Sequence, residues 1–125
     1  MHTQTTILIV DDATFIRNMV KKSLLPPDFK VVGEAANGIE AIQLYKELAP
    51  DIITMDITMR GMDGLTALEE IMKSNPEAKV IMLSSLGEEK FIKKAITLGA
   101  KDFITKPFKP DRLISAIRAI SGKDN

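Results

Sequence analysis

Acidic residues directly follow two short apolar runs of the sequence, and this placement suits metal and phosphate chemistry. Asp11 and Asp12 follow the run Ile7–Val10, and Asp56 follows the run Ile52–Met55. Such runs are typical of buried strands in a parallel sheet, whose carboxyl ends border the ligand crevice. Three carboxylates at one edge repel one another unless a cation lies among them, and oxygen-only ligands suit Mg²⁺. The sequence therefore predicts a magnesium site at this edge.

Two further polar residues follow other apolar runs. Ser84 follows Val80–Leu83, and Lys106 follows the run 102–105. In a parallel sheet both residues reach the same edge as the three acids. A carboxylate nucleophile, a divalent cation, a hydroxyl and an ammonium suffice to accept a phosphoryl group, because such transfer depends on positioning and charge neutralisation more than on a strong base.

Length and composition narrow the class of protein. A chain of 125 residues is of single-domain size, so residues 1–125 are expected to form one domain. Its 17 basic residues balance 17 acidic ones, which does not favour a nucleic-acid partner. The absence of cysteine excludes disulfides and cysteine-bound metals. No leader pattern or long apolar stretch is present, so a cytoplasmic protein without membrane insertion is expected, and His2 is assigned no role.

Strand-like and helix-like patterns alternate five times along the chain. The expected strands are 6–10, 30–34, 51–55, 79–83 and 102–105, and the expected helices are 13–25, 38–48, 64–74, 88–98 and 110–121. Regular alternation predicts an α/β fold with a parallel sheet, right-handed crossovers and helices on both faces. Five strands favour the doubly wound, flavodoxin-like order 2-1-3-4-5, whose crevice lies between strands 1 and 3. Those two strands are the ones that end at the acids.

Several residues together resemble the response-regulator receiver family over essentially the whole chain. These are Asp11-Asp12, Asp56, the segment Gly61–Gly64, Ser84 and Lys106-Pro107-Phe108. Within this family, the segments 11–17 and 54–59 are most similar to chemotaxis regulators of the CheY type.

The resemblance implies a role for each acid. Asp56 is expected to be the phosphoacceptor. Asp12, Asp56 and the backbone carbonyl of Thr58 are expected to hold Mg²⁺, with Asp11 acting mostly through water. The isolated residues also allow a simpler interpretation, in which Asp12 caps the first helix and Asp11 lies in a loop.

Other residues take their expected roles from the same resemblance. Ser84 is expected to bond a phosphoryl oxygen, Lys106 to pair with it, and Phe103 to occupy the family's switching aromatic position. A cis bond is expected between Lys106 and Pro107. One departure is Arg60, where family members usually carry proline, so this loop is either less rigid or brings Arg60 to the acidic crevice.

The function implied is that of a stand-alone phosphorylation switch rather than an enzyme acting on external substrates. A histidine kinase is expected to donate the phosphoryl group, and the face near 88–98, 102–105 and 110–121 to bind a partner, with a flagellar motor switch protein as the expected target. Hydrolysis is expected to be slow because Thr58 and Leu86 orient water poorly, so a partner phosphatase is expected.

Other functions remain open at this point. The chain could pass its phosphoryl group on to a histidine phosphotransfer protein, or act on a separate output enzyme. An FMN-binding electron carrier shares this sheet order, but its first loop donates hydrogen bonds to the FMN phosphate, whereas Asp11 and Asp12 present negative charge there. Many phosphatases with an aspartyl intermediate carry a second aspartate two residues after the nucleophile, where this chain has Thr58.

Overall fold

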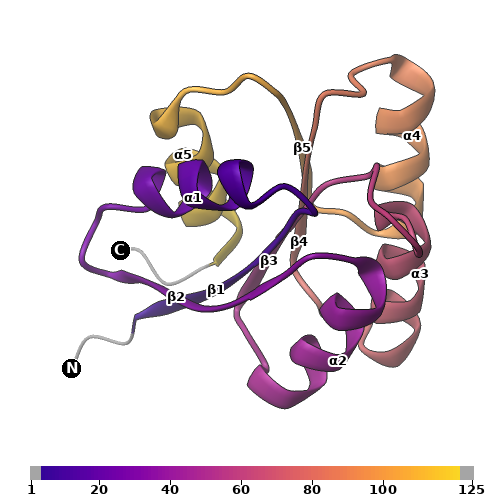
Figure 1. The fold of residues 1–125 in the computed structure, drawn as a ribbon, viewed down its shortest axis with the longest axis horizontal. Helices are drawn as coiled ribbons and strands as arrows, with labels where there is room; N and C mark the ends of the chain where they lie inside the picture. Colours follow the sequence, from indigo (N-terminus) through magenta and orange to yellow (C-terminus); the bar gives the residue numbers. More distant parts are fainter. Residues whose placement is uncertain (1–3, 122–125) are drawn as a thin grey trace.

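The structure is a computed structural model that describes residues 4–121, so His2 lies outside the described residues. Strands and helices alternate along this range (Figure 1). The strands are β1 (Thr5–Val10), β2 (Phe29–Ala35), β3 (Ile52–Met55), β4 (Val80–Ser84) and β5 (Asp102–Thr105). The helices are α1 (Thr14–Ser23), α2 (Gly38–Leu48), α3 (Gly64–Ser74), α4 (Glu89–Leu98) and α5 (Pro110–Ser121).

The five strands form one parallel sheet in the order β2-β1-β3-β4-β5, which confirms the predicted order. Helices α1 and α5 cover one face, and α2, α3 and α4 cover the other (Figure 1). This arrangement follows from the sequence because β3 and β4 are buried along their whole length and need apolar cover on both faces. The carboxyl ends of β1, β3, β4 and β5 consequently reach one edge of the sheet.

Two apolar clusters fix the strands from opposite sides. One contains Leu8, Ile53 and Met82 under α2, α3 and α4. The other contains Ile7 and Ile52, together with residues of α1 and α5. Burying each large aliphatic side chain contributes about 1.5–3 kcal/mol, so these clusters hold the strand ends rigidly in place.

Helix boundaries agree closely with the predicted ones, except at the first helix. We predicted residues 13–25, but α1 ends at Ser23, because the two prolines that follow disfavour helical geometry in the residues before them. Its N-cap is Ala13 without a side-chain cap, so Asp12 does not cap this helix. Ser84 is the last residue of β4 rather than the residue after it.

Candidate functional site

The sheet brings the predicted acids together at its carboxyl edge. Asp11 and Asp12 follow β1, Asp56 follows β3, and one ligand oxygen from each carboxylate lies within 4.8 Å of the others. Asp11 is buried, Asp56 is partly buried and Asp12 is exposed. The donor set is therefore all oxygen, open on one side, and fits a hard divalent cation.

Lys106 lies directly among these acids. Its Nζ donates to Oδ2 of Asp11 at 2.6 Å and to Oδ2 of Asp56 at 3.3 Å. All three side chains are at least 85% buried, because their exposed fractions are 15%, 5% and 13%. The ammonium therefore offsets the repulsion between two carboxylates at a site partly shielded from water.

The backbone holds Lys106 in this place. Its N–H donates to the carbonyl of Ser84 at 2.9 Å, which carries the pairing of β4 and β5 one step beyond the strand. The bond between Lys106 and Pro107 is cis, as predicted.

The loop after β1 is fixed by three hydrogen bonds that all involve Asp11. Its N–H donates to the Ala35 carbonyl at 3.0 Å, and its Oδ1 accepts from the Ala13 N–H at 2.9 Å. Its carbonyl accepts from Nη1 of Arg17 at 2.6 Å. The main chain leading into Asp12 is thus held by β2, by the Asp11 side chain and by Arg17 of α1.

Arg17 is in turn held by Glu34 of β2. Nε of Arg17 lies 3.0 Å from Oε1 of Glu34, and Nζ of Lys21 lies 2.7 Å from Oε2 of the same carboxylate. The hydrogen bond from Lys21, with a further one from Arg17, lowers the pKa of Glu34. Glu34 therefore stays charged at lower pH than an isolated glutamate, and both cations keep their partner. Sequence reasoning missed this contact, since nothing in the spacing links Arg17 to Glu34.

The loop after β3 is anchored close to Asp56. The Asp56 N–H donates to the Val10 carbonyl at 3.1 Å, and Oδ1 of Asp56 accepts from the Ile57 N–H at 2.7 Å. The Gly64 N–H donates to the Ile57 carbonyl at 2.7 Å, and a Cβ atom at Gly64 would lie only 1.8 Å from the Asp56 carbonyl oxygen. The first residue of α3 therefore packs directly on the backbone of Asp56, a contact that only glycine allows.

Ser84, at the end of β4, and Phe103, in β5, are both buried. Ser84 is fully buried, and its Oγ accepts from the Leu86 N–H at 3.1 Å. Phe103 is 9% exposed and belongs to the apolar cluster beneath α2, α3 and α4, on which Leu86 also packs. The aromatic ring is therefore already inside the protein in this structure. Its movement on phosphorylation stays a prediction.

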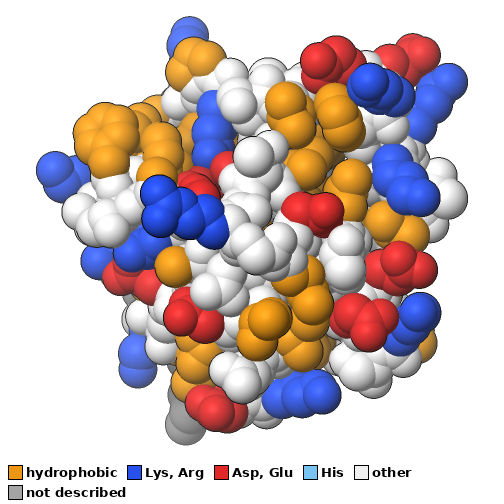
Figure 2. Space-filling view, turned by 45° about the vertical axis from the view of Figure 1, so that its right-hand side comes forward, with side chains coloured by type: hydrophobic (Ala, Val, Ile, Leu, Met, Phe, Trp, Pro, Cys, Tyr) orange, Lys and Arg blue, Asp and Glu red, His pale blue; other side chains and the backbone are white. Residues whose placement is uncertain are grey.

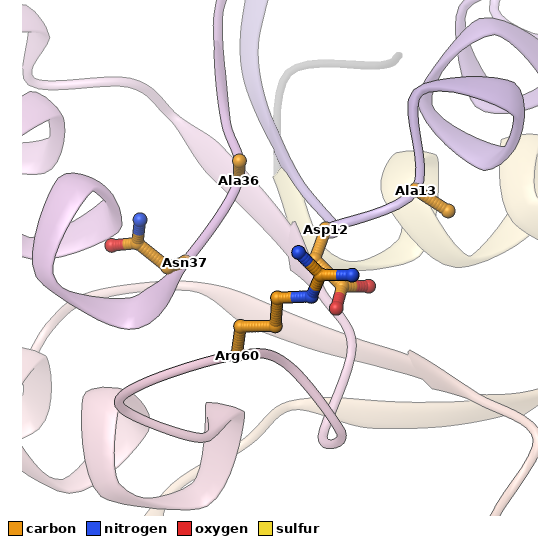
Figure 3. Close-up of a pocket in the computed structure, with 5 residues that line it drawn as sticks. All are labelled: Asp12, Ala13, Ala36, Asn37 and Arg60. Atoms are coloured by element: carbon orange, nitrogen blue, oxygen red, sulfur yellow. The ribbon is translucent and has the colours of Figure 1, made fainter.

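An open pocket of about 510 Å³ lies next to the acids. It is lined by Asp12, Ala13, Ala36, Asn37 and Arg60. Figure 3 shows the Arg60 side chain reaching across this pocket, with its guanidinium group in front of the Asp12 carboxylate. Of the two outcomes predicted for Arg60, this geometry favours the one that brings it to the acidic crevice.

Comparison with known proteins assigns the family. The model of the response regulator receiver domain matches residues 7–118. The chain belongs to the response regulator receiver family. This confirms the predicted family, and it sets aside the FMN carrier and the aspartyl phosphatase as interpretations of the sheet and its acids.

The relatives of this receiver domain place it near chemotaxis proteins. It is 51% identical to the chemotaxis protein CheY of Thermotoga maritima, over 92% of this chain and 96% of the relative. It is 54% identical to CheY of Listeria monocytogenes, over 89% of this chain and 93% of the relative. Among solved structures, the CheX–CheY–BeF₃–Mg²⁺ complex of Borrelia burgdorferi matches with a TM-score of 0.90 and 37% identity, covering 94% of this chain and 90% of that one.

The helices give a separate result on membranes. Within residues 4–121, no helix combines the length and the apolar character that crossing a bilayer demands.

Proposed function

We propose that this chain is a chemotaxis response regulator whose Asp56 accepts a phosphoryl group from a histidine kinase. The observation that carries the proposal is the contact of Lys106 Nζ with both Asp11 and Asp56. Together with Asp12, these two carboxylates can share a cation. The sequence identity of 51% and 54% with two CheY proteins, over 92% and 89% of this chain, supports the chemotaxis role.

The transfer uses the groups already in place. A carboxylate oxygen of Asp56 forms a bond to phosphorus as the bond from phosphorus to the kinase histidine nitrogen breaks, and that nitrogen keeps the electron pair. Asp12, Asp56 and the Thr58 carbonyl would hold Mg²⁺, which would neutralise charge on the phosphoryl oxygens. Lys106 turns from the Asp56 carboxylate to a phosphoryl oxygen, where its charge again has a partner.

The phosphorylated state is read by a protein partner. The buried hydroxyl of Ser84 donates to a phosphoryl oxygen, and this changes the packing of Phe103 on β5. The partner surface is formed by α4, β5 and α5. Charged and apolar side chains alternate over the side of the molecule that includes α4 (Figure 2), which suits contact with a folded protein. A flagellar motor switch protein is the proposed target, and a separate phosphatase the proposed terminator.

A binding experiment tests this function directly. The protein, with and without beryllium fluoride and Mg²⁺ as a stable mimic of the acyl phosphate, is passed over immobilised flagellar motor switch protein. We expect retention to rise with the mimic. Equal retention of both forms, together with transfer of phosphate to a histidine phosphotransfer protein, would instead indicate a relay intermediate.

Mg²⁺ is expected to stabilise the folded protein, because a ligand that binds only this state shifts unfolding by mass action. At a concentration 100 times its dissociation constant the gain is about 2.7 kcal/mol. Asp12→Ala removes a direct ligand, so we expect most of this gain to disappear in thermal denaturation with and without Mg²⁺. Asp28→Ala, at the opposite edge of the sheet, is the control and should respond like the parent. Equal Mg²⁺ responses in Asp12→Ala and the parent would remove Asp12 from the ligand set.

Ser84→Ala is expected to accept phosphate but to signal poorly, because the mutant keeps the nucleophile and loses the hydroxyl that reports its modification. Coupled sites commonly change affinity about 5–150-fold, and we expect less than about twofold in the mutant. Partner affinity with and without beryllium fluoride is the measurement. The exposed neighbour Ser85→Ala is the control. A gain in Ser84→Ala as large as in the control would show that the signal takes another route.

A further inference from the structure

We propose that Arg17 is a positioning residue that holds the main chain between Asp11 and Asp12 in the conformation that binds the divalent cation. The inference deepens the proposed function, since it concerns the same metal site. It rests on contacts of Arg17 with the Asp11 backbone, Glu34 and Thr14 rather than on the carboxylates of the three acids.

The guanidinium of Arg17 uses three nitrogens in three directions. Nη1 donates to the Asp11 carbonyl at 2.6 Å, Nε to Glu34 at 3.0 Å and Nη2 to the Thr14 hydroxyl at 3.1 Å. The side chain is only 15% exposed. A planar, fixed fork is what arginine offers and lysine does not, so a lysine in this place can satisfy one of these acceptors but not all three.

The contact with the Asp11 carbonyl orients the next peptide unit, and that unit carries Asp12. Asp12 is the most exposed of the three acids and makes no hydrogen bond or ion pair to another described residue through its own side chain. Its direction therefore depends on the backbone before it. Without Arg17, the Asp11 carbonyl loses its side-chain donor, and Asp11 keeps its bonds to Ala35, Ala13 and Lys106, none of which involves that carbonyl.

Charge and position predict opposite results when Arg17 is removed. Deleting a cation close to an acidic site strengthens binding of Mg²⁺ if charge alone matters. Deleting a group that orients a metal-coordinating residue weakens metal binding, commonly about 10–100-fold. Glu34, which also pairs with Lys21, offsets part of the charge of Arg17, so we expect the positional effect to dominate.

The test compares Mg²⁺ affinity, by calorimetric titration, in the parent, Arg17→Met, Arg17→Lys and Lys21→Met. Lys21 pairs with the same Glu34 carboxylate but makes no contact with the Asp11 carbonyl, so it controls for the lost ion pair. We expect Arg17→Met to bind Mg²⁺ about tenfold more weakly, Arg17→Lys to recover little, and Lys21→Met to stay within about twofold of the parent. Circular dichroism and metal-free thermal denaturation confirm that each variant is folded.

Two results contradict the inference in different ways. If Arg17→Met binds Mg²⁺ as tightly as the parent or more tightly, Arg17 does not position the site, although the proposed function survives. If the parent itself binds no Mg²⁺, the metal site of the proposed function fails and this inference fails with it.

A separate observation, the pocket next to the acids, supports a second inference. Arg60 lines this pocket opposite Asp12, is exposed, and has no ion-pair partner within 4 Å among residues 4–121. We infer that the positive charge of Arg60, across the pocket from Asp12, competes with Mg²⁺ for the acidic edge and so weakens Mg²⁺ binding. Its role is the reverse of that of Arg17, because it contributes charge without fixing the loop.

Arg60→Gln is expected to bind Mg²⁺ about two- to fivefold more tightly at low ionic strength, and the difference should shrink at 0.5 M salt, since exposed charges are screened there. Arg118→Gln is the control, because Arg118 pairs with Asp28 at the opposite edge of the sheet. Unchanged or weaker Mg²⁺ binding in Arg60→Gln, measured by the same titration, would contradict the inference.

Discussion

Asp56→Asn is expected to abolish phosphoryl uptake from a small acyl phosphate in the presence of Mg²⁺. The amide is nearly the same size, and its oxygen can still accept the Ile57 N–H that Oδ1 accepts at 2.7 Å. It is not a nucleophile, however, and Lys106 keeps only Asp11 as its partner. The fold should therefore persist while the chemistry stops. Intact-protein mass spectrometry, which detects the added phosphoryl mass, is the measurement.

Asp63→Asn provides a matched control in the same loop. Asp63 caps α3 by accepting from the Thr66 N–H at 2.8 Å, and asparagine caps helices about as well. This variant should be phosphorylated like the parent. An Asp56→Asn protein that still gains the full phosphoryl mass would place the acceptor elsewhere.

Gly64→Ala is expected to destabilise the protein by more than about 3 kcal/mol, at the upper end of the cost of overpacking. The new Cβ would lie 1.8 Å from the Asp56 carbonyl oxygen, which is backbone and cannot turn away. The hydrogen bonds of Asp56 to Val10 and of Gly64 to Ile57 hold both sides of the clash. Urea denaturation measures the loss in the free energy of unfolding.

Gly61→Ala separates this clash from the ordinary cost of replacing glycine. Gly61 has open space around its Cβ position but a φ of 76°, so the substitution should cost about 1–2 kcal/mol through backbone strain alone. If Gly64→Ala costs no more than Gly61→Ala, the loop after β3 is more pliable than its contacts indicate.

The sheet and the acids were predictable because burial dictates both. Runs such as Ile52–Met55 are apolar on both faces, which leaves a covered parallel sheet as the solution, and the order of five strands then places Asp11 and Asp56 side by side. The end of α1 at Ser23 was harder to predict from the sequence, since Leu24 and Leu25 continue the apolar pattern up to the prolines.

The contacts that hold the site could not be predicted in the same way. The bond of Arg17 to the Asp11 carbonyl and its pairing with Glu34 depend on how α1 lies against β2. The segment Gly61–Gly64 contributed to the family resemblance, but the contact of Gly64 with the Asp56 carbonyl exists only once α3 is packed. The buried position of Phe103 is likewise a result of packing. Phe103 lies on β5, an edge strand, where an aromatic side chain can be either buried or exposed to solvent.

Chemical mapping of the modified residue is the decisive test that Asp56 accepts the phosphoryl group. The protein is phosphorylated with a small acyl phosphate and Mg²⁺, then reduced with borohydride, which converts an aspartyl phosphate to homoserine, and its peptides are sequenced by mass spectrometry. We expect homoserine at position 56 alone, and only when Mg²⁺ was present. Homoserine at position 11 or 12, or a phosphoryl group that survives on a serine or threonine, would contradict it.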